Sequence, residues 1–197
     1  MYNLEQIVNE IYFTPSDINE HIPTLVEYGS KCDHITEMGV RGIKSTWALL
    51  GSGPKKMISY DLRNPSEYGG DINMVYNVAK QYGIDFTFRE ADVLKIDIEE
   101  TDLLFLDTWH AYKQLKSELL KHENKVKKYI IMHDTTSYEF NDEQAYEIID
   151  NVLNTPELSQ GKGLIQAINE FLQINNNWIL HKRYTNNNGL TILKRNE

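Results

Sequence analysis

Two short segments of the chain combine acidic residues and histidines at spacings that suit acid–base and metal chemistry. Asp107 follows the apolar run 103–106, and His110 comes three residues later, about one helical turn away. Another apolar run ends in His133 and Asp134. Carboxylates bind hard divalent cations, and a neutral imidazole accepts protons near neutral pH. We therefore expect Asp107 and Asp134 to hold an ion such as Mg²⁺ or Mn²⁺, with His110 as the proton acceptor.

The two histidines also have structural interpretations. His133 as a third ligand would shift the metal preference toward Mn²⁺, Fe²⁺ or Zn²⁺, but a histidine at a strand end can instead bind backbone. His110 can cap the helix that follows it. The remaining histidines are expected to be surface residues or to be satisfied by hydrogen bonds: His21, His34 and His122.

A glycine turn in the first third of the chain indicates a nucleoside-binding site. Glu37, Gly39 and Gly42 follow an apolar run and precede a hydroxyl-rich helix start at Ser45, and Asp61 ends the next apolar run. Glycines where a strand turns into a helix bring backbone N–H groups to the edge of the sheet. An acid at the end of the next strand can bind ribose hydroxyls.

Acidic residues end five predicted strands: Glu37, Asp61, Asp92, Asp107 and Asp134. The carboxyl ends of parallel strands share one edge of a sheet, so these side chains are expected to line one crevice. The competing interpretation is that each is a local helix N-cap. A hydrophobic core has no use for five unpaired carboxylates, and this favours the crevice.

The elements that must position these residues alternate along the chain. Short apolar strands are predicted at 34–39, 56–61, 86–91, 103–107 and 129–133. Helices are predicted at 3–12, 16–29, 43–50, 71–82, 110–124, 142–153 and 162–174. This alternation predicts a doubly wound, parallel α/β sandwich. An Asn-Gly turn within 185–189 joins runs 178–184 and 190–194 into an antiparallel hairpin. We expect a single domain, 1–197, with a helical cap at 1–30 and a core at 31–197.

Composition narrows the function. The 197 residues carry a net charge of −9, which disfavours nucleic acid as a partner. The apolar runs are too short to span a membrane, and no signal peptide is visible. The single cysteine, Cys32, suits a reducing compartment. We expect a cytoplasmic protein without membrane or nucleic-acid partners; self-association stays open.

Together these features resemble the class I S-adenosylmethionine-dependent methyltransferases, from about Ile35 to the hairpin. The resemblance is closest to metal-dependent small-molecule O-methyltransferases, the branch with cephalosporin-hydroxylase-like and macrolide-sugar O-methyltransferases. It rests on Glu37-x-Gly39-x-x-Gly42, Asp61, Asp107-x-x-His110 and His133-Asp134. His133 stands where that branch has an acid. The resemblance implies a Rossmann-like, mostly parallel seven-stranded sheet that ends in the antiparallel hairpin.

The resemblance also implies roles for individual residues. S-adenosylmethionine would be bound by Glu37, Gly39, Arg41, Gly42, Ser45, Asp61, Leu62, Asp92, Val93 and Asp107. Asp107 and His110 would be catalytic, and a metal such as Mg²⁺ or Mn²⁺ would be held by Asp107, His133 and Asp134. The acceptor would be a small molecule or a sugar. From the sequence we expect its pocket to be built from the N-terminal helices and the segment 135–142, where Tyr138 and Phe140 would suit a flat or sugar-like acceptor.

Three other classes compete with this interpretation. A nicotinamide dehydrogenase would have glycine where Glu37 stands, because an acid repels pyrophosphate but suits an ammonium group. A nucleic-acid methyltransferase is disfavoured by charge, and by Asp-Thr-Trp-His in place of its Asn/Asp-Pro-Pro-aromatic motif. A non-catalytic module that keeps the cofactor pocket is disfavoured by the Asp107, His110 and Asp134 set.

Overall fold

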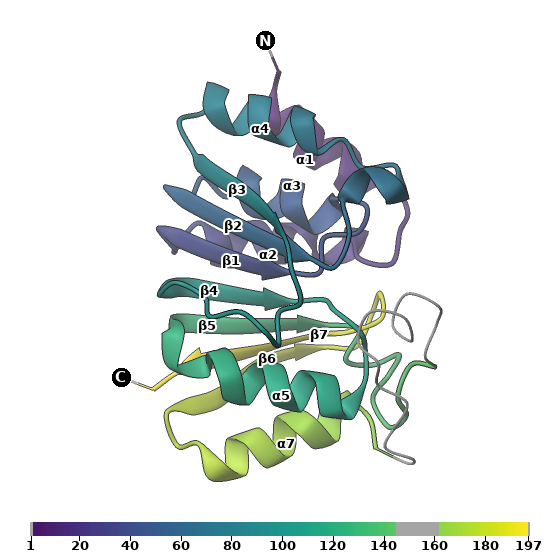
Figure 1. Ribbon diagram of the computed structural model, residues 1–197. Helices are drawn as coiled ribbons and strands as arrows, with labels where there is room; N and C mark the ends of the chain where they lie inside the picture. Colours follow the sequence, from purple (N-terminus) through teal and green to yellow (C-terminus); the bar gives the residue numbers. More distant parts are fainter. Residues whose placement is uncertain (1, 145–161, 197) are drawn as a thin grey trace.

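A computed structural model of the chain describes residues 2–144 and 162–196, which form a seven-stranded sheet between two helical layers (Figure 1). The strand order is β3-β2-β1-β4-β5-β7-β6, and all strands are parallel except β7, which pairs antiparallel with β5 and β6. The strands are β1 (His34–Met38), β2 (Lys56–Asp61), β3 (Asp85–Glu90), β4 (Thr101–Leu106), β5 (Val126–His133), β6 (Trp178–Tyr184) and β7 (Leu190–Arg195).

The helices divide between the two faces of the sheet (Figure 1). One face packs against α1 (Leu4–Phe13), α2 (Ile22–Gly29), α3 (Lys44–Gly51) and α4 (Ile72–Gln81). The other packs against α5 (Tyr112–His122) and α7 (Leu164–Ile174). Short 3₁₀ turns are η1 (Asn19–His21), η2 (Pro65–Tyr68) and η3 (Glu123–Lys125). No helix among the described residues is both long and apolar enough to cross a bilayer.

The central strand β4 shows why the strands read as continuous apolar runs. Successive side chains of a strand point to opposite faces, and β4 is buried on both. Leu103 and Phe105 join the core beneath α1–α4, whereas Leu104 and Leu106 join the core beneath α5 and α7. This segment of the sequence therefore does not show the alternation of apolar and polar residues that a strand with one exposed face would have.

The strand register sets the position of the candidate site. Met38 of β1 lies opposite Leu106 of β4, which in turn lies opposite Met132 of β5. The residues that follow these three, Gly39, Asp107 and His133, therefore lie beside one another at the carboxyl ends of the strands. The carboxyl ends of β1, β4 and β5 form one edge.

The fold predicted from the sequence is confirmed, including the antiparallel hairpin at the end of the sheet. Several helix boundaries differ from prediction. The predicted helix 16–29 is only the 3₁₀ turn η1 followed by α2, which starts at Ile22 with Pro23 in its first turn. The predicted helix 110–124 begins at Tyr112, because Ala111 is extended. Of the predicted helix 142–153, residues 142–144 are not helical and the others lie outside the described residues.

Candidate active site

The turn between β1 and α3 packs directly against the end of β4. Gly39 has φ +87°, and a Cβ built on it would lie 1.9 Å from the carbonyl oxygen of Asp107. Only glycine fits both the left-handed backbone and this approach. Arg41 (φ +42°) and Ile43 (φ +59°) adopt left-handed conformations without being glycine. Such strained backbone is concentrated at functional sites, so the turn is a candidate for ligand binding.

Asp61, at the end of β2, holds this turn in place. Its Oδ2 accepts hydrogen bonds from the backbone N–H groups of Val40 (2.7 Å) and Arg41 (2.9 Å). Its Oδ1 accepts one from the N–H of Arg63 (3.1 Å). The predicted ribose-binding acid therefore lies beside the glycine turn, at the predicted edge of the sheet.

Glu37 lies beneath the turn and is completely buried. Its carboxylate accepts hydrogen bonds from the hydroxyls of Ser45 (2.7 Å), Thr46 (2.9 Å) and Ser59 (2.6 Å). Burial raises the pKa of Glu37 to about 7, although the three hydroxyls lower it. The described hydrogen bonds of this carboxylate all come from protein hydroxyls.

A cavity of about 900 Å³ opens at the carboxyl ends of the strands. This volume lies within the usual range for small-molecule and cofactor sites. The residues predicted from the sequence that line it are Gly39, Arg41, Gly42, Ser45, Asp61, Leu62, Asp92, Val93, Asp107, His110 and Asp134. Glu37 and His133 do not line it, and Asp17, Ile18, Lys44 and Gln114 line it without having been predicted.

His110 lies among three carboxylates at one end of this cavity. Its Nε2 is 3.2 Å from Asp107 Oδ1 and 3.0 Å from Asp134 Oδ2, and its Nδ1 is 3.0 Å from Glu143 Oε2. The ring of Tyr138 stacks on the imidazole, with centroids 4.9 Å apart. Burial lowers the pKa of His110, but the three carboxylates raise it well above its usual value.

His133 lies behind the two aspartates and is buried. Its Nδ1 is 3.2 Å from Asp107 Oδ1 and 3.4 Å from Asp134 Oδ2. Its Nε2 is 3.1 Å from the carbonyl oxygen of Asp17 and 3.3 Å from that of Asn187. Carbonyls only accept hydrogen bonds, so Nε2 carries a proton and Nδ1 faces the carboxylates. Burial lowers the pKa of His133, but Asp107 and Asp134 raise it to about 10.

The aspartates show the complementary shifts. Burial raises the pKa of Asp134, but its hydrogen bonds with His110 and His133 bring the pKa below its ordinary value. The pKa of Asp107 is also lowered, because the attraction of His133 and His110 outweighs burial. Asp134 has a left-handed backbone (φ +58°), and its Oδ1 is buried without a hydrogen-bond partner among the described residues.

These residues fit a divalent cation. One ligand atom each from Asp107, His110 and Asp134 can be chosen so that all three lie within 4.8 Å of one another. Two carboxylate oxygens and one imidazole nitrogen form a donor set suited to Mn²⁺ and similar ions. The free Oδ1 of Asp134 is an unused acceptor, and Glu143 on Nδ1 is the outer carboxylate that commonly orients a metal-binding histidine. The sequence predicted His133 rather than His110 as the imidazole ligand.

Sequence reasoning missed Glu143, and it expected the N-terminal helices at the acceptor pocket without singling out Asp17 or Ile18, which line the cavity. Glu143 follows a polar stretch without periodicity, and no local signal marks it. Two histidines that were expected to be satisfied are buried and hydrogen-bonded to backbone: His21 to the carbonyl of Asn186 and His122 to that of Val93. Phe140, which was expected at the acceptor site, is exposed and does not line the cavity.

Comparison with known proteins identifies the class of fold. No protein-family model and no curated protein sequence matches the chain. A Staphylococcus aureus protein, described as a proposed caffeoyl-CoA O-methyltransferase, is similar over 100% of this chain and 93% of its own, with 14% identity and a TM-score of 0.61. Magnesium protoporphyrin IX methyltransferase from Synechocystis PCC 6803, solved with bound SAH (S-adenosylhomocysteine), matches over 98% and 94%, with 12% identity and a TM-score of 0.59.

An O-methyltransferase from Bacillus cereus in complex with SAH also matches, over 98% of this chain and 90% of its own, with 13% identity and a TM-score of 0.55. The chain therefore has the Rossmann-like fold of the methyltransferases. At these identities the likeness concerns the fold, and function must be argued from the site.

Proposed function

We propose that the protein is an S-adenosylmethionine-dependent O-methyltransferase that acts on a hydroxyl of a small molecule or sugar with help from a divalent cation. One observation carries the proposal. The strained glycine turn with Asp61 and the cluster of Asp107, His110 and Asp134 line the same cavity, at the carboxyl edge of a methyltransferase-type sheet. A cofactor at the turn would point its reactive end toward the cluster.

The cofactor-binding half of the proposal rests on the turn and its neighbours. Gly39 brings backbone close to the strand ends, and a Cβ at Gly42 would meet no protein atom within 4 Å, which leaves room for a ligand. Asp61 would bind the ribose hydroxyls, and Asp92 and Val93 would flank the adenine. Glu37 would act from beneath the turn, by holding the hydroxyls of Ser45 and Ser59.

The cation-binding half rests on the two aspartates. Asp107 and Asp134 would hold the ion, and His133 would keep their carboxylates in position from behind. A bound divalent cation would lower the pKa of an acceptor hydroxyl. Mg²⁺ and Mn²⁺ both suit a set rich in oxygen ligands.

His110 is the proposed proton acceptor. Glu143 accepts a hydrogen bond from Nδ1 and so leaves Nε2 as the nitrogen that would accept a proton, an orientation also used by catalytic histidines. The three carboxylates hold a proton on His110. A cation held by Asp107 and Asp134 would offset their charge, which would lower the pKa of His110 and let Nε2 accept a proton. Tyr138 keeps the imidazole ring in place by stacking. The rest of the contribution is positioning of acceptor and methyl group.

Methyl transfer from radiolabelled S-adenosylmethionine to a panel of catechols and sugars, with Mn²⁺, tests the proposal. Asp107→Asn should raise the Kd for Mn²⁺ at least tenfold and abolish transfer. His110→Ala should abolish transfer but leave the Kd for Mn²⁺ within about threefold. A tenfold loss of Mn²⁺ affinity in His110→Ala would instead assign His110 to the ligand set, since its ligand atom lies within 4.8 Å of those of Asp107 and Asp134.

The competing classes give different results in the same assays. A non-catalytic module would bind S-adenosylhomocysteine but transfer no methyl group to any acceptor. A nicotinamide oxidoreductase would bind NAD⁺ more tightly than S-adenosylhomocysteine. Either outcome would contradict the proposal.

A further inference from the structure

The loop between β6 and β7 has an unusual backbone and reaches the candidate site from the far end of the chain. Asn187 (φ +43°), Asn188 (φ +68°) and Gly189 (φ +92°) are consecutive residues in left-handed conformations. Asparagine tolerates this region better than most residues, but such a run persists only when surrounding contacts hold it. The hairpin needs a turn here, but a turn alone does not require contacts with the segment between α1 and α2 or with the end of β5.

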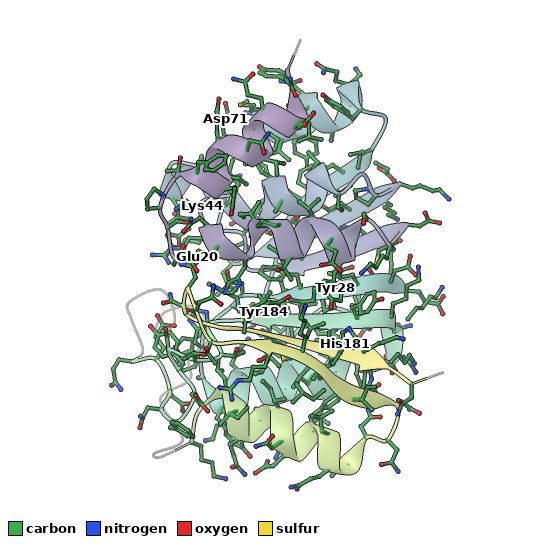
Figure 2. All side chains as sticks on the ribbon, turned by 180° about the vertical axis from the view of Figure 1, so that it is seen from behind. Glu20, Tyr28, Lys44, Asp71, His181 and Tyr184 are labelled. Atoms are coloured by element: carbon green, nitrogen blue, oxygen red, sulfur yellow. The ribbon has the colours of Figure 1, made fainter. Side chains whose placement is uncertain are left out.

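The side chain of Asn187 holds the segment between α1 and α2. Its Nδ2 donates a hydrogen bond to the carbonyl of Ser16 (2.8 Å), and its Oδ1 accepts one from the N–H of Glu20 (2.9 Å). Figure 2 shows Glu20 beside the tip of the β6–β7 hairpin. These two bonds bracket Asp17 and Ile18, which line the cavity. The side-chain amide of Asn187 thus holds the segment that contributes Asp17 and Ile18 to the cavity on both sides of these two residues.

The same loop also holds the end of β5. The carbonyl oxygens of Asn187 and Asp17 both lie within hydrogen-bond distance of His133 Nε2, at 3.3 and 3.1 Å. The carbonyl of Asn188 accepts hydrogen bonds from the N–H groups of Thr136 (2.8 Å) and Ser137 (3.1 Å). The ring of His133 is therefore held on one side by this loop, with Asp107 and Asp134 on the other.

We propose that Asn187 is a positioning residue that sets the geometry of the two cation-binding aspartates through His133. Its carbonyl binds His133 directly, and its side-chain amide holds the Ser16–Glu20 segment, which supplies the second carbonyl to the same nitrogen. Both acceptors orient Nε2, and so the Nδ1 atom that faces Asp107 and Asp134. Outer partners of this kind change metal affinity by about 10- to 100-fold when they are removed.

This inference rests on the proposed function, because it assumes a cation at Asp107 and Asp134. The chain offers a matched pair of variants. Asn187→Gly removes both side-chain hydrogen bonds and tolerates a positive φ. Asn188→Gly makes the same change in the adjacent left-handed residue, whose side-chain amide has no hydrogen bond among the described residues. Differences between the two variants therefore report the lost contacts rather than added backbone freedom.

Four measurements are made on both variants and the wild type. Amide hydrogen exchange at Glu20 shows whether the Asn187 contact is lost. Calorimetric titration gives the Kd for Mn²⁺ and the Kd for S-adenosylhomocysteine. Nitrogen NMR of the His133 imidazole reports its hydrogen bonds without any metal.

We expect Asn187→Gly to speed exchange at Glu20, shift the His133 nitrogens and raise the Kd for Mn²⁺ about tenfold. Affinity for S-adenosylhomocysteine should stay within twofold, and Asn188→Gly should resemble the wild type throughout. The inference is overturned if Asn187→Gly speeds exchange at Glu20 but leaves His133 and Mn²⁺ affinity as in Asn188→Gly. If the wild type binds no Mn²⁺, the proposal of a cation site is refuted, whatever the result for Asn187. In that case His133 nitrogen shifts that stay unchanged in Asn187→Gly would still overturn the positioning role.

Discussion

Replacing Glu37 by glutamine should change how stability depends on pH. Burial raises the pKa of Glu37 from its usual 4.5 to about 7. Between these values the folded protein binds a proton that the unfolded chain does not. The stability that Glu37 provides is therefore fully present below about pH 4.5 and is lost as pH rises toward 7. Each pKa unit corresponds to about 1.4 kcal/mol, so the loss is about 3 kcal/mol in all, most of it between pH 5 and 8.

Urea unfolding of wild type and Glu37→Gln at pH 5, 6, 7 and 8 measures this effect. Glutamine cannot ionise, so the variant should gain about 2 to 3 kcal/mol relative to wild type across the range. Glu27→Gln is the control, because the hydrogen bond from Lys31 lowers the pKa of this exposed acid below its usual 4.5. Glu27 is therefore ionised in both the folded and the unfolded protein above pH 5, and the effect of this variant should not change between pH 5 and 8. A difference between Glu37→Gln and wild type that stays constant from pH 5 to 8 would refute the reasoning.

Three further predictions concern the turn, the cation and Glu143. Gly39→Ala should cost about 3 kcal/mol or more in urea unfolding, because its Cβ would meet Asp107, whereas Gly42→Ala should stay within about 0.5 kcal/mol; equal effects would contradict the close approach. Mn²⁺ at a hundred times its Kd should stabilise the fold by about 2.7 kcal/mol and raise Tm by about 5–10 °C in calorimetry, an effect absent in Asp134→Asn. Glu143→Gln should lower kcat about 100-fold, because Nδ1 of His110 loses its carboxylate, and an unchanged kcat would remove Glu143 from the site.

Much of the fold follows from local patterns in the sequence. The central strands are buried on both faces, so runs such as 103–106 are apolar throughout and easily recognised. The final hairpin was also predictable from a local signal, the Asn-Gly turn, because these residues tolerate the left-handed backbone of a tight turn. Helix starts were less predictable. Ala111 is extended, and the first N–H group of α5, that of Tyr112, donates to the side chain of Asp142, which lies far along the chain.

The composition of the site was predictable, but its internal arrangement was not. The strand-end acids were expected at one edge, and Asp61, Asp92, Asp107 and Asp134 all line the cavity. Glu37 departs from this pattern, because Ser45, Thr46 and Ser59 hold it below the turn. No local spacing encodes those partners.

The two histidines show the same limit. Which imidazole nitrogen faces the aspartates depends on Asp17 and Asn187 for His133 and on Glu143 for His110. These partners come from distant segments that meet only in the folded protein. Residue type and spacing therefore indicated metal chemistry without distinguishing ligand, base and supporting residue.

Calorimetric titration of the protein with S-adenosylhomocysteine, with Mn²⁺ and in EDTA, tests the central claim most directly. We expect S-adenosylhomocysteine to bind with a stoichiometry of one in both conditions, and Mn²⁺ to bind the wild type but not Asp107→Asn. These results would show that the protein binds the cofactor product and that its cation site depends on Asp107, a residue that lines the same cavity as the glycine turn. Failure of the wild type to bind S-adenosylhomocysteine in either condition would contradict the account.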